Sequence, residues 1–181
     1  MQVRLLIDGV DRTGSLLERS WEIQGNAFGV LDHASFLLDD PTKAISSVTG
    51  KDVIIEDFSD ALTRFFGGVL TDVSSYTHGL GRRFQCNALD WTFRLDRAVA
   101  SETYRGKSDQ YIITESVASP KGLFFSPTTD AELPGFIVNT TNVKIGKANT
   151  QFVQFKRDSI RDAMDTLADA IGFVWYVDPF K

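Results

Sequence analysis

Residues 1–97 consist of short β-prone runs separated by turn residues, with no long amphipathic helix between them. The predicted strands are 3–10, 16–24, 34–38, 52–58, 63–73 and 82–89. Short connections join antiparallel strands, whereas parallel strands need a long crossover. The pattern therefore predicts an antiparallel β-barrel or β-sandwich for residues 1–97, as the first part of a β-rich α+β protein.

Two of these runs carry more detailed information. In the run 82–89, Phe84, Cys86 and Ala88 alternate with polar residues, which predicts one buried and one exposed face. The Gly67-Gly68 pair interrupts a strong strand, and glycine inside a strand is typical of a bulge or a sharp bend.

The pattern changes after Arg97, where a smaller α+β domain is predicted over residues 98–181. Ser108 is expected to cap a short helix that runs through Val117. Residues 119–150 are rich in Ser, Thr, Pro, Gly and Asn, which predicts loops with short extended pieces such as 135–138.

The clearest helix is predicted over residues 160–171, where apolar side chains recur at helical spacing. Ser159 and Asp162 form a start like a capping box, and Gly172 supplies the stop. The run 173–177 follows as a strand with large residues on both faces, and such a strand needs neighbours on each side. We expect its partner beyond Lys181, so that the domain is truncated at its C-terminus; the alternative is a place inside the existing sheet.

Charge and cysteine content exclude several classes of function. The chain of 181 residues has 19 basic and 24 acidic residues, a net charge of -5, which has the wrong sign for a protein whose main task is to wrap nucleic acid. The single cysteine, Cys86, provides neither a disulfide framework nor a CxxC metal pair. The longest apolar run, 170–177, is eight residues, so neither a secretory signal nor a membrane-spanning segment is predicted.

No catalytic, cofactor-binding or metal site is predicted, no cofactor is expected, and the oligomer interface is unknown from the sequence. His33 and His78 are not in a metal-binding spacing, and Cys86 falls on the apolar face of its strand. Glycines near Arg82 and Arg83 lack the pattern of a phosphate-binding loop and indicate a hairpin turn.

Two further groups allow weaker interpretations. A run of carboxylates lacks the spacing of a calcium loop, and a solvated acidic edge explains it at least as well as a glycosidase pair. A group of basic and aromatic residues is typical of weak nucleic-acid contact, which the net acidic charge disfavours. The carboxylates are Asp39, Asp40, Asp52, Glu56, Asp57 and Asp60, and the basic-aromatic group is Lys144, Lys147, Lys156, Arg157, Phe152 and Phe155.

Several stretches, taken in order, resemble the N-terminal portion of phage tail hub and tail-tip proteins, the family that includes baseplate hubs. They are Ala34-Ser-Phe-Leu-Leu-Asp-Asp-Pro41 with Gly50-Lys-Asp-Val-Ile-Ile55, then Phe66-Gly-Gly-Val-Leu-Thr-Asp-Val73, then Cys86-Asn-Ala-Leu-Asp-Trp-Thr-Phe-Arg-Leu-Asp-Arg97. The match continues at 104–108 and 159–177, so the resemblance spans nearly the whole chain. Its motifs are packing and turn signatures.

The resemblance implies a non-enzymatic structural component of a phage or prophage tail, a hub fragment that links tail tube to tail tip and lines the DNA conduit. It implies a tail-tube-like β-barrel in residues 1–97 and self-assembly into a ring, a trimer in the full-length form. The implied partners are the tail tube and other tail-tip proteins, with only transient passage of DNA. The implied location is the virion tail, after assembly in the host bacterial cytoplasm.

The charge of residues 1–97 fits a conduit, because ten basic and fourteen acidic residues give a net charge of -4 and DNA then slides without sticking. Two alternatives stay open. One is a carbohydrate-binding β-module of a receptor-binding tail protein, which would use exposed Trp91, Trp175 and Tyr176. The other is a hydrolase with dispersed carboxylates.

Overall fold

The computed structural model describes residues 2–25, 32–41, 45, 48–59, 63–115, 117–118, 120–124, 150–172 and 174–177. The chain divides into two compact units, each treated separately below. The first comprises Met1–Phe93 with Val177–Phe180, and the second comprises Arg94–Tyr176 with Lys181. The division into domains 1–97 and 98–181 stays a prediction.

The first unit is built on one seven-stranded antiparallel sheet. Its strands are β1 (Val3–Ile7), β2 (Val10–Asp11), β3 (Glu22–Gln24), β4 (His33–Asp40), β5 (Asp52–Asp57), β6 (Thr63–His78) and β7 (Gly81–Asp90). Their order in the sheet is β2-β1-β5-β6-β7-β4-β3, and every pair is antiparallel. The predicted β-rich class with antiparallel strands is confirmed.

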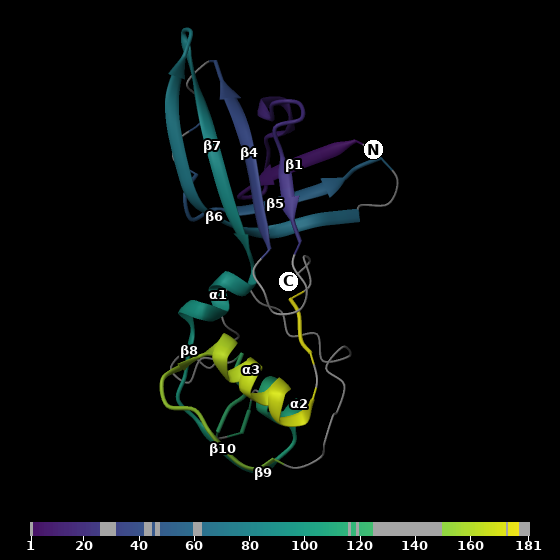
Figure 1. The fold of residues 1–181 in the computed structure, drawn as a ribbon, viewed down its shortest axis with the longest axis vertical. Helices are drawn as coiled ribbons and strands as arrows, with labels where there is room; N and C mark the ends of the chain where they lie inside the picture. Colours follow the sequence, from purple (N-terminus) through teal and green to yellow (C-terminus); the bar gives the residue numbers. More distant parts are fainter. Residues whose placement is uncertain are drawn as a thin grey trace. The chain divides into compact units, whose positions relative to one another are not determined.

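The 16-residue strand β6 has a different neighbour along each half of its length. Its first half pairs with β5 and its second half with β7, and it turns from the direction of one to that of the other (Figure 1). Register shifts lie on both sides of the Gly67-Gly68 pair. A β-carbon on Gly68 would collide with the backbone of β7 at Leu89, so only glycine fits there. The predicted bend is thus found where the strand changes partner.

A segment that follows β2 connects the two ends of the sheet. The Arg12 N–H donates to the Leu5 carbonyl of β1 at 2.8 Å, and the Leu17 N–H donates to the Leu37 carbonyl of β4 at 3.0 Å. Between these bonds lies a short 3-10 helix, η1 (Thr13–Ser15). The prediction of one strand over residues 16–24 is wrong, because only Glu22–Gln24 pairs as a strand; Leu16 forms an isolated bridge with Leu38.

The inside of the sheet is filled by apolar side chains. Fully buried members include Leu5, Phe36, Leu38, Val53 and Leu70. Burial of each large side chain contributes about 1.5–3 kcal/mol relative to exposure. The interior is therefore a packed core, and contacts with other molecules would be made by residues on the surface of this unit.

In its described residues, the second unit combines three helices with two small sheets. Helix α1 (Thr92–Arg97), whose first two residues belong to the first unit, is followed by β8 (Val99–Ala100), β9 (Thr103–Lys107), α2 (Asp109–Thr114), β10 (Thr150–Gln154), β11 (Asp158–Ser159) and α3 (Ile160–Ile171). β9 pairs with β10 and β8 pairs with β11, both antiparallel. This arrangement confirms an α+β character for the part of the chain after Arg97.

The predicted helix caps are confirmed. The Ser108 hydroxyl accepts from the Tyr111 N–H at 3.1 Å, although the helix ends at Thr114 and not at Val117. The Ser159 hydroxyl accepts from the Asp162 N–H at 3.0 Å, and Gly172 ends α3 with φ +71°. Asp162 also accepts from the Ser159 hydroxyl at 2.8 Å, which completes a local capping pair.

The described residues of the predicted strand 173–177, which are 174–177, join no sheet of this chain, so the alternative of a place inside the existing sheet is wrong. The Trp175 indole N–H instead donates to Asp165 of α3 at 2.8 Å, while Val174 and Tyr176 are exposed. A β-prone sequence becomes a strand only when another strand pairs with it. The extended piece at 135–138 lies outside the described residues.

Candidate functional site

The two histidines cannot share a ligand. His33 begins β4 opposite Leu89, and His78 ends β6 opposite Gly81. Because these partners lie eight residues apart on β7, the imidazoles are separated by roughly 25 Å. Among the residues that the structure describes, no group of three His, Cys, Asp or Glu side chains is arranged to hold a metal ion.

Cys86 is a core residue, as the alternation of β7 predicts. Its side chain is completely buried between the apolar residues of the sheet interior. Burial raises the pKa of the Cys86 thiol to about 12, with a smaller contribution from Asp72. Because the reactive species is the thiolate, Cys86 is chemically inert in the folded protein.

The carboxylates that are close in sequence form separate ion pairs instead of one site. Asp40 pairs with Arg82 at 3.2 Å and Glu56 pairs with Arg4 at 3.4 Å. Asp40 and Glu56 are buried, so the interpretation of this run as a solvated acidic edge is wrong for both. The cross-strand partners were not visible in sequence.

The other carboxylates of this run have local or exposed partners. Asp39 pairs with Arg83 at 3.1 Å, and both side chains are partly exposed. Asp57 accepts hydrogen bonds from the Ser59 hydroxyl and N–H, which lower the pKa of the Asp57 carboxyl. Asp52 is partly buried at the start of β5, and Asp60 lies outside the described residues.

The aromatic residues do not form the expected sugar-binding group. Trp91 is 1% exposed, which removes it from any stacking platform. The Trp175 indole is hydrogen-bonded to Asp165 of α3, and Tyr176 is exposed. The carbohydrate-binding alternative therefore loses its central residue.

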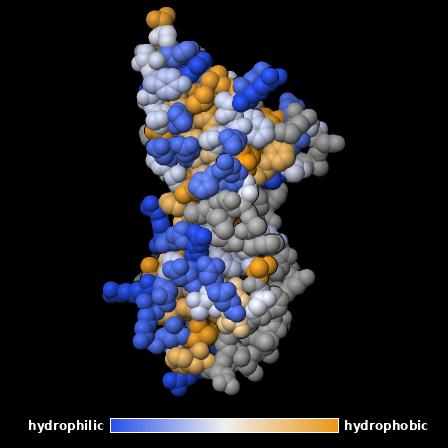
Figure 2. Space-filling view, viewed as in Figure 1, coloured by the Kyte–Doolittle hydropathy of each residue, from blue (hydrophilic) through white to orange (hydrophobic). Residues whose placement is uncertain are grey.

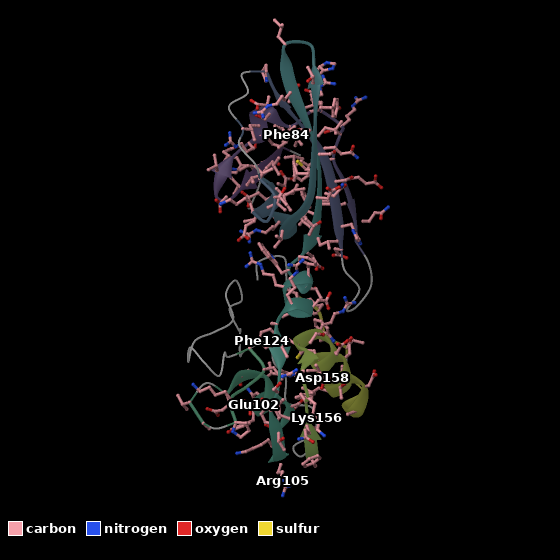
Figure 3. All side chains as sticks on the ribbon, turned by 90° about the vertical axis from the view of Figure 1, so that its left-hand side faces the viewer. Phe84, Glu102, Arg105, Phe124, Lys156 and Asp158 are labelled. Atoms are coloured by element: carbon pink, nitrogen blue, oxygen red, sulfur yellow. The ribbon has the colours of Figure 1, made fainter. Side chains whose placement is uncertain are left out.

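The basic-aromatic group is also divided. Phe155 is buried and packs edge-on against Tyr104, with ring centroids 6.2 Å apart. Phe152 is exposed beneath the Arg105 guanidinium, 5.5 Å from the ring centroid, and Arg105 projects away from the second unit (Figure 3). Lys156 and Arg157 are exposed beyond β10. Lys144 and Lys147 lie outside the described residues.

The outer face of the β6–β7–β4–β3 part of the sheet is polar and net acidic. Three cross-strand rows make up this surface, which we name the outer face: Asp72, Asn87, Ser35 and Glu22; Ser74, Gln85 and Leu37; and Tyr76, Arg83 and Asp39. These rows hold three carboxylates and one cation, and that cation is paired with Asp39. Such a surface repels a polyanion and offers it no unpaired cation within the three rows.

The turn between β6 and β7 is the predicted hairpin turn with two arginines behind it. Gly79 has φ +59°, and His78 pairs with Gly81 across a two-residue loop. Leu80, the second loop residue, is 95% exposed. A hydrophobic group projects from the end of this hairpin, at the top of Figure 2. The sequence predicted the turn but gave no signal that its apolar side chain stands alone.

A cavity opens on the same unit beside η1. It has a volume of about 610 Å³ and is lined by Val3, Thr13, Gly14, Leu16, Leu17, Glu18, Arg19 and Trp21. Sequence reasoning missed it, because the cavity forms where the segment after β2 folds back on β1, and no sequence motif marks that turn. Among the described residues, no helix has both the length and the apolar character needed to cross a membrane.

No family model matches this chain, and no curated protein matches it. A solved structure of the prophage MuSo2 43 kDa tail protein from Shewanella oneidensis matches 99% of the chain with a TM-score of 0.64 and 12% sequence identity. The match covers 52% of the MuSo2 protein, so the chain spans about half the length of that protein.

Two further solved structures match with lower TM-scores. A tail protein from Neisseria meningitidis MC58 has a TM-score of 0.43 and 11% identity, over 59% of this chain and 30% of the other. An E. coli component of the type VI secretion system, described as structurally similar to T4 bacteriophage tail proteins, has a TM-score of 0.48 and 13% identity, over 83% and 42%. The assignment of the fold rests on the MuSo2 protein: this chain shares the fold of a solved phage tail protein, in agreement with the fold that its sequence resemblance implies.

Proposed function

We propose that the chain is a structural, non-enzymatic component of a phage or prophage tail, a hub that links the tail tube to the tail tip. The observation that carries this proposal is the fold shared with the MuSo2 tail protein over 99% of the chain. In this proposal the chain forms a ring in the virion tail, as a trimer in the full-length form, after assembly in the bacterial cytoplasm. Its partners are the tail tube and other tail-tip proteins.

The outer face supports a role in lining the DNA conduit. Its carboxylates repel phosphate groups, and Arg83 is paired with Asp39 at 3.1 Å. Each cation that contacts a phosphate adds salt-dependent affinity, which would hold DNA in place. A surface of short polar side chains with net negative charge lets DNA pass without being retained.

The filled sheet interior supports a structural role over a catalytic one. In the carboxylate run, Asp39, Asp40 and Glu56 are each engaged in an ion pair. Cys86 is buried. A hydrolase of the glycosidase type needs two carboxyl groups that flank one scissile bond. The described part of the chain instead uses its charged groups to connect strands.

Deletion of the coding segment from the phage or prophage genome, followed by complementation, tests the proposal. We expect electron micrographs of particles in which tail tubes are absent or end without a tip, with normal tails restored by the complementing copy. Antibody against the chain is expected to label the junction of tube and tip. Infectious particles that assemble without the chain, or labelling elsewhere on the particle, would contradict the proposal.

A further inference from the structure

The cavity beside η1 has the size and the mixed lining of a site for a small molecule. Its volume of about 610 Å³ lies within the range of about 300–1,000 Å³ that is typical of ligand pockets. Val3, Leu16 and Leu17 provide an apolar wall, and Glu18 and Arg19 add charged groups. Ligand pockets combine apolar surface with a few polar groups that orient the ligand, and this cavity contains both.

Hydrogen bonds to two strands hold the segment that lines the cavity. The Thr13 hydroxyl accepts from the Leu5 N–H of β1 at 3.0 Å, and the Leu17 N–H donates to the Leu37 carbonyl of β4 at 3.0 Å. The Ser20 hydroxyl donates to the Leu17 carbonyl at 2.7 Å and accepts from the Leu37 N–H at 3.2 Å. A preorganised site of this kind loses little conformational entropy when a ligand binds.

Trp21 gives the cavity an aromatic surface that is held in place. Its side chain packs against the core of the first unit and also lines the cavity. The Trp21 indole N–H has no hydrogen-bond partner in the part of the chain that the structure describes. An indole combines an apolar ring with one polar donor, so it can stack on a sugar ring and donate to a hydroxyl at the same time.

Glu18 and Arg19 bring charged groups that have no other partner among the described residues. Both side chains are exposed, and neither forms an ion pair or a hydrogen bond there. Adjacent charges of opposite sign largely cancel at a distance, so the two groups together do not select an ion of either sign. The carboxylate accepts hydrogen bonds and the guanidinium donates them. A hydroxyl group does both, so this pair suits a neutral ligand with several hydroxyl groups.

Arg19 also has a backbone conformation that favours glycine. The Ser20 N–H donates to the Leu17 carbonyl at 3.1 Å and closes a turn, in which Arg19 is the third residue with φ +58°. Glycine or asparagine is usual where a turn requires positive φ at this position. Backbone strain of this kind is found preferentially at ligand-binding sites, and the Arg19 side chain lines the cavity.

We propose that the η1 cavity binds an N-acetylated sugar residue of a glycan. The sugar ring stacks on Trp21, and its hydroxyl groups bond to Glu18 and Arg19. The methyl of the N-acetyl group contacts the wall formed by Leu16 and Leu17, a contact that an unsubstituted hexose cannot make. This site shares no residue with the aromatic group predicted from the sequence. It also goes beyond the proposed function, which does not require a glycan.

Isothermal titration calorimetry of the full chain tests the ligand class. The probes are chitotriose, which is a trimer of N-acetylglucosamine, maltotriose, which is a trimer of glucose, and the zwitterionic dipeptide leucyl-leucine. We expect saturable binding of chitotriose and about tenfold weaker binding of maltotriose, because an apolar pocket discriminates by roughly this factor against a ligand that lacks an apolar group. Absence of chitotriose binding, equal binding of maltotriose, or tighter binding of the dipeptide would each overturn the proposal.

A pair of arginine variants tests the site itself. Arg19→Gly removes a binding group, and Arg157→Gly is the matched control, because Arg157 is an exposed arginine with φ +62° in the second unit and does not line the cavity. Glycine adopts positive φ without strain, so both variants are expected to fold, which thermal unfolding checks. We expect Arg19→Gly to weaken chitotriose binding by about tenfold, through loss of a charged hydrogen bond, and Arg157→Gly to leave it unchanged. Equal affinities of the two variants would overturn the proposal.

The glycan site and the proposed function can fail separately. Sugar binding is measured on the isolated chain, whereas the tail role is measured on particles. Chitotriose binding by a chain that is absent from tails would refute the proposed function alone. Normal tails containing a chain that does not bind chitotriose would refute the glycan site alone.

Discussion

Asp39 and Asp40 are neighbours in sequence but lie in opposite environments, because successive residues of a strand face opposite sides of the sheet. Asp40 is 2% exposed and accepts hydrogen bonds from Arg82 and from the Ile45 N–H. Asp39 pairs with Arg83 on the outer face, where the Asp39 side chain is 38% exposed. The same two strands, β4 and β7, thus carry one ion pair with a buried carboxylate and one with an exposed carboxylate, so the contributions of the two pairs to stability can be compared.

Asp40→Ala is expected to lower the free energy of unfolding by about 1–3 kcal/mol, because it leaves a buried N–H without its acceptor. Asp39→Ala is expected to cost less than about 1 kcal/mol, as is usual for exposed pairs. Urea denaturation of the two variants and the wild type measures the difference. Equal losses would show that the Ile45 N–H and Arg82 find other partners.

Cys86 is expected to resist thiol reagents in the folded state. Because burial raises the pKa of its thiol to about 12, an increase from pH 7 to pH 9 does not populate the thiolate, whereas an ordinary thiol becomes largely ionised. Absorbance assays with a thiol reagent, with and without urea, measure the reaction rate. Fast modification of the folded protein at pH 9 would contradict the burial of this residue.

At this scale, local alternation predicted the burial of Cys86, but the ion pairs could not be predicted. Arg82 and Asp40 are 42 residues apart in the chain, and Arg4 and Glu56 are 52 apart. Nothing in a linear pattern identifies such partners before the strand order is known. The exposure of Leu80 was missed for the same reason, since a hairpin was predicted but not its projection beyond the sheet.

Among the elements, those specified by local contacts were predicted best. The caps at Ser108 and Ser159 depend on hydrogen bonds three residues away, so the sequence contains the whole interaction. The strand prediction at 16–24 failed, and 174–177 found no place in the existing sheet, because a strand depends on a neighbour that the sequence does not reveal. Helix α1 was missed because six residues are too few to show a helical periodicity. Just before this helix, the Asp90 carboxylate accepts a hydrogen bond from the Thr92 N–H at 2.8 Å.

Strand β6 depends on Gly68, where the backbone of β7 approaches most closely. Gly68→Ala is expected to lower the free energy of unfolding by about 1–3 kcal/mol. The added β-carbon would collide with the backbone carbonyl of Leu89, which cannot move without breaking hydrogen bonds between β6 and β7. Gly14→Ala is the control, as an added β-carbon there meets no atom within 4 Å. Thermal unfolding followed by circular dichroism compares the variants, and an unchanged midpoint for Gly68→Ala would refute the close approach.

The whole chain contains two compact units, and each has buried residues of its own. We expect two unfolding transitions, since units with separate cores need not unfold together. Phe36→Ala in the first unit is expected to destabilise one transition by about 3–5 kcal/mol, and Ile112→Ala in the second to destabilise the other by about 2–5 kcal/mol. Differential scanning calorimetry resolves them; a single transition that responds to both substitutions would show one cooperative body.

At this largest scale the sequence predicted a β-rich chain with an α+β part but left barrel and sandwich open. The connection from Arg12 to Leu17, which reaches both β1 and β4, is formed by a loop with weak strand character. Curvature of a sheet comes from bulges and twist, and composition does not report these. Composition and periodicity therefore left this choice open, and the fold was assigned through the sequence resemblance and the comparison with the MuSo2 tail protein.

The sheet ends on β2 and β3, with two and three residues. Edge strands this short offer few unpaired backbone groups, so a newly made chain is a poor template for amyloid-like strand addition. Protected edges leave side-chain contacts as the main route by which other molecules can associate with this sheet.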